Sequence, residues 1–166
     1  NGVVFDPIIF REEAEAIEAL NVPIRERLVI SKKAHLIVPT HRVLDAASEK
    51  SKGASKIGST LKGIGPTYKD KTGREGLRIG DILAADFRDR YEALKAKHIS
   101  QINNFGFEFN IDEQEKEWFD AIEYLKTFTL VDGEYYINQA LGKSLRVLAE
   151  GAQGSMLDVD FGSYPF

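Results

Sequence analysis

The sequence predicts a helix-rich α/β fold in which about five helices accompany about four short strands of a larger sheet. Two observations lead to this prediction. Short apolar runs rich in Val and Ile are separated by longer segments whose apolar residues recur every three or four positions. The composition agrees with it, because the 166 residues are 43% hydrophobic and 29% charged, as is typical of one globular domain.

The first part of the chain, residues 1–52, is predicted to form a strand and a helix, then a strand and a second helix after a turn. After the first apolar run, Asp6 can cap a helix and Pro7 suits its first position. Apolar residues then follow with helical spacing at Phe10, Ala14, Ile17 and Leu20. The remaining elements of this part are expected at 28–30, 36–38 and 40–52.

Residues 53–80 are predicted to be a long Gly-rich loop. Seven glycines and one proline leave no helical periodicity, and a long loop in a compact domain is more often functional than decorative. From Lys52 to Arg78, five Lys and two Arg face one Asp and one Glu, whereas the whole chain carries a net charge of −4. A basic segment within an acidic chain indicates a site for one small anion.

The rest of the chain is predicted to be helical and then to return to the sheet. Helices are expected to begin near Asp81, Asp112 and Tyr135, and 145–149 is predicted to be a buried strand that leads into a turn, Glu150-Gly151-Ala152-Gln153-Gly154. We therefore treat the chain as one fragment with four parts, 1–52, 53–80, 81–142 and 143–166.

Composition excludes several classes of function. The chain has no Cys, so it has neither disulfides nor a thiolate metal site. The net negative charge argues against nucleic acid as a partner, and no apolar run reaches the ~20 residues that cross a membrane. His35 and His41 have no partner at metal-ligand spacing, so no metal site is expected from this chain alone. His98 is predicted to be a core histidine.

The best candidate for chemistry is the stretch 57–68. Its glycines let backbone N–H groups approach an oxyanion, its hydroxyls donate hydrogen bonds and Lys62 adds charge, a combination that suits a phosphate. It matches neither the P-loop pattern nor the dinucleotide-binding pattern. The alternative is a mobile Gly-rich surface loop.

Two further groups are weaker candidates when each is taken alone. Arg74 and Arg78 lie just beyond the loop and could bind phosphate with two hydrogen bonds each, or they could be solvated charges. Gln153 could face a heterocycle edge, since its amide both donates and accepts, or it could be an ordinary turn residue.

Taken together, these segments resemble adenylosuccinate synthetase. The likeness lies in IGSTLKGIGPTYKDKTGREGLRIGD at 57–81 and EGAQGSMLDVDFGSYPF at 150–166, with NGVVFDP and VPIRERLVIS near the start. Enzymes of this family join IMP to L-aspartate at the expense of GTP, giving adenylosuccinate, GDP and phosphate in AMP biosynthesis. The resemblance implies a cytoplasmic homodimer.

The resemblance also implies roles for individual residues. Thr60 would bind the IMP phosphate beside Ser59, Arg74 would reach the IMP of the partner subunit, and Gln153 would be catalytic at the purine O6 as well as bind IMP. The chain departs from the family pattern in two places. Leu61 stands where the family commonly has Gly, and Glu75 stands where a second basic residue is often seen.

The family's N-terminal phosphate loop with its Mg²⁺ ligands, its catalytic His and its C-terminal elements for aspartate and guanine have no counterpart here. We therefore expect an internal fragment that is inactive alone and binds neither Mg²⁺ nor GTP, although the parent enzyme uses both. The alternative hypothesis is a non-catalytic homodimerisation module. The simplest test is to mix the chain with IMP, GTP, Mg²⁺ and aspartate and to measure turnover, which we expect to be absent.

Overall fold

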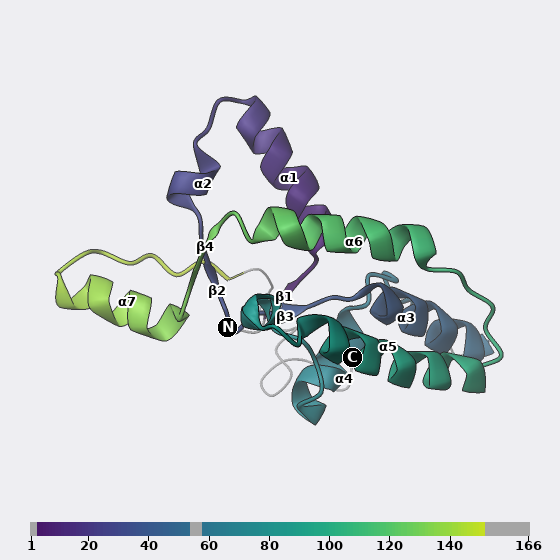
Figure 1. The fold of residues 1–166 in the computed structure, drawn as a ribbon. Helices are drawn as coiled ribbons and strands as arrows, with labels where there is room; N and C mark the ends of the chain where they lie inside the picture. The colour runs from purple at the N-terminus through teal and green to yellow at the C-terminus, as the bar shows by residue number, and fades with distance from the viewer. Residues whose placement is uncertain (1–2, 54–57, 152–166) are drawn as a thin grey trace. The chain divides into compact units, whose positions relative to one another are not determined.

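The computed structural model describes residues 3–53 and 58–151, and the chain divides into two units, Asn1–Gly133 and Glu134–Phe166. The first unit contains most of the helices (Figure 1): α1 Pro7–Ala19, α2 Ile24–Arg27, α3 Pro39–Ser51, α4 Ile64–Gly73, the 3-10 helix η2 Ile79–Leu83, α5 Phe87–Asn104 and α6 Asp112–Leu125. The helix α7, Gly133–Gly142, begins at the end of this unit.

Four short strands form two parallel pairs in the first unit. β1 (Val4–Phe5) pairs with β3 (His35–Leu36), and β2 (Val29–Ser31) pairs with β4 (Thr129–Val131). The register of the second pair places Ile30 opposite Leu130. The predicted helix-rich α/β fold is confirmed, with seven α-helices among the described residues where about five were expected.

The start of α1 is built as the sequence predicts. The Asp6 carboxylate accepts hydrogen bonds from the N–H groups of Ile8 and Ile9, and Pro7 occupies the first helical position. Along the predicted apolar stripe Ala14 is buried, whereas Leu20 is exposed where the helix ends. The cap therefore determines where this helix begins.

The main core lies where α5 and α6 meet the strands. Its largest members, Trp118 of α6 and Tyr91 of α5, are buried and stack with ring centroids 5.1 Å apart. The Trp118 indole N–H donates to the Ile37 carbonyl at 2.8 Å, which satisfies its one polar group. Around this core α1 packs against α6, and α3 packs against both α4 and α5.

The predicted strand at 145–149 is wrong. Within the described residues no strand pairs with this stretch, and the Leu148 side chain is 93% exposed, not buried. The fourth strand is instead Thr129–Val131, which directly follows α6 and finds a partner in β2. Apolar residues form a strand only where a partner supplies hydrogen bonds, and periodicity alone does not identify that partner.

The prediction that 53–80 lacks regular structure is also wrong, because α4 occupies Ile64–Gly73. Its two buried residues, Thr67 and Asp70, are polar. The buried side of α4 therefore contacts the rest of the protein through polar groups. It has no apolar stripe, so the pattern of apolar residues does not indicate a helix here.

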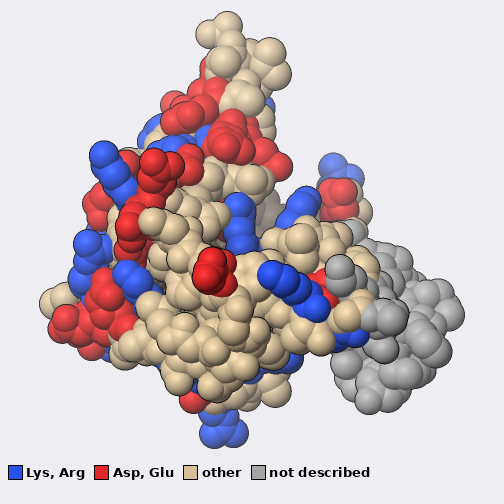
Figure 2. All heavy atoms as spheres, turned by 90° about the vertical axis from the view of Figure 1, so that its right-hand side faces the viewer, with Lys and Arg blue, Asp and Glu red and all other residues tan. Residues whose placement is uncertain are grey.

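Charged side chains of both signs lie on the surface of the described residues (Figure 2). Acidic and basic side chains are interspersed on the face shown in Figure 2, without a continuous basic surface among its described residues. In the described part of the chain, no helix has both the length and the apolar character needed to cross a bilayer.

Candidate functional site

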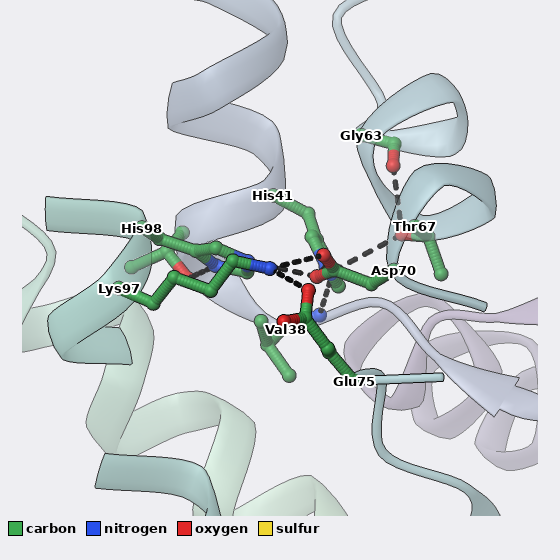
Figure 3. A network of polar contacts seen from close by, with 9 residues as sticks. Val38, His41, Gly63, Thr67, Asp70, Glu75, Lys97 and His98 are labelled. Carbon is green, nitrogen blue, oxygen red and sulfur yellow. Dashed lines mark hydrogen bonds and ion pairs between the residues drawn. The ribbon is translucent and has the colours of Figure 1, made fainter. Parts of the chain in front are cut away.

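Three helices meet at a buried carboxylate (Figure 3). Asp70 of α4 accepts hydrogen bonds from Nε2 of His41 on α3 and Nε2 of His98 on α5, both at 2.8 Å from its Oδ2 atom. All three side chains are buried. We call these residues the Asp70 network. The predicted core position of His98 is confirmed.

The hydrogen bonds of His41 determine which ring nitrogen carries its proton. The Val38 backbone N–H donates to Nδ1 of His41 at 3.0 Å, so Nδ1 is an acceptor and Nε2 carries the proton that Asp70 receives. A metal ligand must offer a lone pair, which this Nε2 does not have. The ligand atoms of the Asp70 network lie within 4.8 Å of one another, but their chemistry fits a hydrogen-bonded network and not a metal centre.

The two imidazole N–H bonds stabilise the negative charge of the Asp70 carboxylate. Burial would raise the pKa of the Asp70 carboxyl, but the hydrogen bonds from His41 and His98 outweigh it and hold that pKa well below its usual range. Burial lowers the pKa of His41, which favours the neutral ring that the Val38 bond requires. Asp70 is thus an ionised acceptor at neutral pH.

Asp70 also shapes the end of α4 that presents Arg74. The Asp70 carbonyl accepts a hydrogen bond from the backbone N–H of Arg74. It also accepts from the backbone N–H groups of Glu75, at 2.9 Å, and Gly76, at 3.2 Å. Arg74 closes the helix in the left-handed conformation, with φ +63°, and its side chain is exposed. The network that anchors Asp70 therefore also determines where the Arg74 guanidinium leaves the helix.

Glu75, one of the two departures from the family pattern, has a partner in this chain. Its carboxylate forms an ion pair with Lys97 of α5, and Lys97 also lies 3.4 Å from Oδ1 of Asp70. A cavity of about 390 Å³ opens beside them and is lined by charged residues including Arg74, Glu75, Asp81, Arg90 and Lys97. The negative charge that follows Arg74 is therefore paired with Lys97.

The loop before α4 is held by two acidic residues of α3, Asp45 and Glu49, which we call the α3 carboxylate pair. Glu49 accepts hydrogen bonds from the N–H groups of Gly58 and Ser59, at 2.6 and 3.4 Å. Asp45 accepts from the Ser59 hydroxyl at 2.7 Å and from the Gly63 N–H at 3.0 Å. Donors that were predicted to bind a phosphate are therefore bonded within the chain.

Gly63 brings the loop against the backbone of α3. Its φ is +76°, and a Cβ atom there would lie 3.0 Å from the backbone of His41 and Arg42. Gly58 also has a positive φ, of +84°, but a Cβ there would meet no atom of the described residues within 4 Å. The two glycines thus share a left-handed conformation and differ in available space.

This difference yields a prediction. Gly63→Ala should lower the free energy of unfolding by about 1–3 kcal/mol more than Gly58→Ala, because only the first substitution adds an overpacking cost to the conformational cost. Urea-induced unfolding of the two variants measures the difference. Equal losses would show that the loop can move away from α3 at no cost.

The structure separates the residues that were predicted to bind IMP. Ser59 is half-buried and Thr60 is exposed at the N-terminal side of α4, whereas Arg74 caps its C-terminus. A helix of 10 residues is about 15 Å long, so the two ends of α4 do not meet at one phosphate within a single chain.

The other two candidates differ in what the structure says of them. The Arg78 side chain is exposed, and the backbone N–H of Arg78 donates to the Asp81 carboxylate. Gln153 lies outside the described residues.

The sequence patterns do not predict the Asp70 network or the α3 carboxylate pair. The spacing of Asp45 and Glu49, one helical turn apart just before a Gly-rich loop, was the only available signal. His41 and His98 are 29 and 28 residues from Asp70 in the sequence, and no local pattern joins them.

Comparison with known proteins gives a consistent result. Residues 1–166 match the family model of adenylosuccinate synthetase. The chain is 58% identical to the adenylosuccinate synthetases of Flavobacterium johnsoniae, over 168 residues, and Phocaeicola vulgatus, over 166 residues. Each alignment covers 100% of this chain but only 40% and 39% of those relatives, so the chain spans about two fifths of their length.

A solved structure is also similar to this chain, the fully ligated adenylosuccinate synthetase from Plasmodium falciparum. The superposition has a TM-score of 0.78 at 32% sequence identity, and it covers 93% of this chain and 37% of that chain.

Proposed function

The chain belongs to the adenylosuccinate synthetase family, and we propose that it forms the IMP-binding and subunit-contact part of an enzyme that joins IMP to L-aspartate. The complete enzyme uses GTP, releases GDP and phosphate, and supplies adenylosuccinate for AMP synthesis in the cytoplasm. The family match over residues 1–166 carries this proposal.

Within this reaction Thr60 binds the phosphate of IMP. It stands at the exposed turn of the Gly-rich loop, where its hydroxyl and the exposed Lys62 near it can meet an anion. Gln153, in the EGAQG motif, acts at the purine O6 and contributes to IMP binding. Ser59 is the neighbouring hydroxyl in the same loop.

Arg74 acts on the IMP of the partner subunit in a homodimer. Its position at the far end of α4 from Thr60 supports this role, because one bound phosphate in the same chain cannot meet both. The exposed side chain can extend into another subunit, and a guanidinium binds phosphate through two hydrogen bonds.

The Asp70 network does not fit Mg²⁺, and the sequence has no P-loop for the phosphates of GTP. The Asp70 network has its lone pairs and protons committed to hydrogen bonds, and the sequence lacks the P-loop pattern. Other parts of the complete enzyme would hold the metal ion and the nucleotide.

Activity of the complete enzyme tests the proposed function. Incubation with IMP, GTP, Mg²⁺ and aspartate should raise the absorbance of adenylosuccinate, whereas the 166-residue chain alone should show no turnover. Lack of turnover by the complete enzyme under these conditions would contradict the proposal. Turnover by the chain alone would show that the catalytic groups lie within it.

Replacement of Arg74 tests its proposed role. Arg74→Ala should raise the KM for IMP by roughly 10- to 100-fold, because a hydrogen bond to a charged group contributes about 1.5–3 kcal/mol. Arg74→Lys should restore part of the loss, since Lys keeps the charge but not the paired hydrogen bonds. Steady-state kinetics at saturating GTP and aspartate measures both, and an unchanged KM would show that Arg74 is a solvated charge.

Mixing two variants tests whether Arg74 acts across subunits. In a hybrid dimer of Arg74→Ala and Thr60→Ala subunits, one of the two sites has both wild-type residues. Random exchange should therefore restore about a quarter of the wild-type activity at low IMP, as expected for a two-fold symmetric dimer. A mixture no more active than its components would place Arg74 in the site of its own subunit.

A further inference from the structure

The α3 carboxylate pair and the Gly-rich loop satisfy one another's polar groups. Glu49 is only 7% exposed, and a buried carboxylate is stable only where donors replace the water it has lost. Here the donors are the N–H groups of Gly58 and Ser59, together with Lys52 at 3.2 Å. The Gly58 N–H contributes most to holding the pKa of the Glu49 carboxyl below its usual range.

Asp45 ties together the two ends of the same loop. It lies one helical turn before Glu49, where two like charges repel unless donors lie between or around them. One of its oxygens accepts from the Ser59 hydroxyl and the other from the Gly63 N–H. The two carboxylates therefore bind the beginning and the end of the segment 58–63.

Between these attachments the loop is exposed. Thr60, Leu61 and Lys62 all face solvent. Leu61 adopts a left-handed conformation with φ +56°, which is costly for a residue with a Cβ atom and persists only where the surrounding structure holds it. The bonds to α3 on either side of Leu61 supply that restraint.

Ser59 uses its hydroxyl within the loop. The Oγ atom donates to Asp45 at 2.7 Å and accepts from the Leu61 N–H at 3.2 Å. Its only proton is therefore committed to a carboxylate. Thr60, the next residue, is more exposed and better placed to meet a ligand.

We infer that Asp45 and Glu49 are positioning residues which hold the base of the Gly-rich loop so that Thr60 is presented to the phosphate of IMP. Ser59 belongs to this support and does not contact the phosphate. The inference rests on the proposed function for its ligand, and on the hydrogen bonds of Gly58, Ser59 and Gly63 for its geometry.

In the opposite arrangement, Asp45 and Glu49 would compete with the phosphate of IMP for the donors of the loop. If they filled the place of the phosphate and IMP had to displace them, removing their charge would tighten IMP binding. If they position the loop, removing their charge loosens it and weakens IMP binding. The sign of the change in KM therefore separates the two arrangements.

Glu49→Gln and Asp45→Asn in the complete enzyme provide this test. Each keeps the side-chain shape but weakens charge-assisted hydrogen bonds, so the KM for IMP should rise about tenfold while kcat changes little. Glu123→Gln is the matched control, because Glu123 is an exposed residue of α6 paired with Lys126 of the same turn. An unchanged or lower KM in both variants would overturn the inference.

Amide hydrogen exchange measures how firmly the loop is held, and it does not depend on catalysis. Glu49→Gln should speed exchange at the Gly58 and Ser59 amides, and Asp45→Asn should speed it at Gly63, with no change in the Glu123→Gln control. If the complete enzyme does not act on IMP, the proposed function fails, but exchange still decides whether the carboxylates hold the loop. Unaltered exchange at all three amides would overturn the positioning role.

Double-mutant cycles show through which contact each hydroxyl acts. Ser59→Ala combined with Asp45→Asn should raise the KM for IMP no more than Asp45→Asn alone, because Asp45→Asn already weakens the support that Ser59 shares. Thr60→Ala combined with Asp45→Asn should raise the KM for IMP no more than Thr60→Ala alone, because the support acts through the position of Thr60, and additive effects would overturn the positioning role. Independent effects of Ser59→Ala and Asp45→Asn would show that Ser59 binds the ligand directly.

Discussion

Asp70→Asn should lower the free energy of unfolding by about 3–5 kcal/mol, the loss that follows when one partner is removed from a buried ionic network. Asp70 accepts two imidazole N–H bonds on one oxygen and lies near Lys97 with the other. An Asn in its place can keep its one acceptor oxygen toward the two imidazoles, but its NH₂ group then faces the Lys97 ammonium. The neutral oxygen also accepts the two buried N–H bonds more weakly than a carboxylate does.

The matched control is Glu75→Gln, which removes an acidic group that also contacts Lys97. The Glu75 side chain is 53% exposed, so its ion pair contributes at most about 1 kcal/mol. Urea-induced unfolding at pH 7 and at one protein concentration compares both variants with the wild type. Similar losses in the two would show that Asp70 is an ordinary surface charge.

The dependence on pH follows from the lowered pKa of Asp70. The folded protein holds the ionised carboxylate more strongly than the unfolded chain, so its stabilisation is fully present above the unfolded pKa of about 3.9. It is lost as the pH falls through the lower folded value. The difference between wild type and Asp70→Asn should therefore stay constant from pH 7 to about pH 5 and shrink below about pH 4.

Gln153→Leu in the complete enzyme should lower kcat by about 10²–10³-fold and leave the KM for IMP little changed. The prediction rests on the EGAQG motif, because Gln153 lies outside the described residues. A side-chain donor whose bond strengthens as O6 is phosphorylated stabilises the transition state more than the bound substrate. Leu has about the same bulk, so the change removes the amide without leaving a cavity.

Gln139→Leu is the control for this substitution, since Gln139 is an exposed residue of α7 and carries no proposed role. Initial rates over a range of IMP concentrations separate the two kinetic constants. A raised KM with normal kcat would restrict Gln153 to substrate binding.

Local sequence signals predicted the helices whose formation depends on residues close together in the sequence. The cap at Asp6 and the position of Pro7 were sufficient for the start of α1, and the apolar spacing around Trp118 predicted α6. These predictions succeed because caps and amphipathic faces involve residues within one helical turn.

The errors occurred where the decisive contact is distant or polar. The run 145–149 is apolar but finds no strand partner among the described residues, and Thr129–Val131 becomes a strand because β2, about 100 residues earlier, pairs with it. The helix α4 escaped detection because Thr67 and Asp70 anchor it through hydrogen bonds.

The sequence by itself determined the family and the candidate residues, since motifs such as GIGPTYKDK and EGAQG are contiguous and specific. Only the tertiary structure decided which contacts the candidates make within the chain. It showed that the Ser59 hydroxyl is committed to Asp45 and that Thr60 and Arg74 stand at opposite ends of α4. The physical reason is that buried hydrogen bonds join α3, α4 and α5 across many residues, and a polar contact of that kind leaves no periodic trace in the chain.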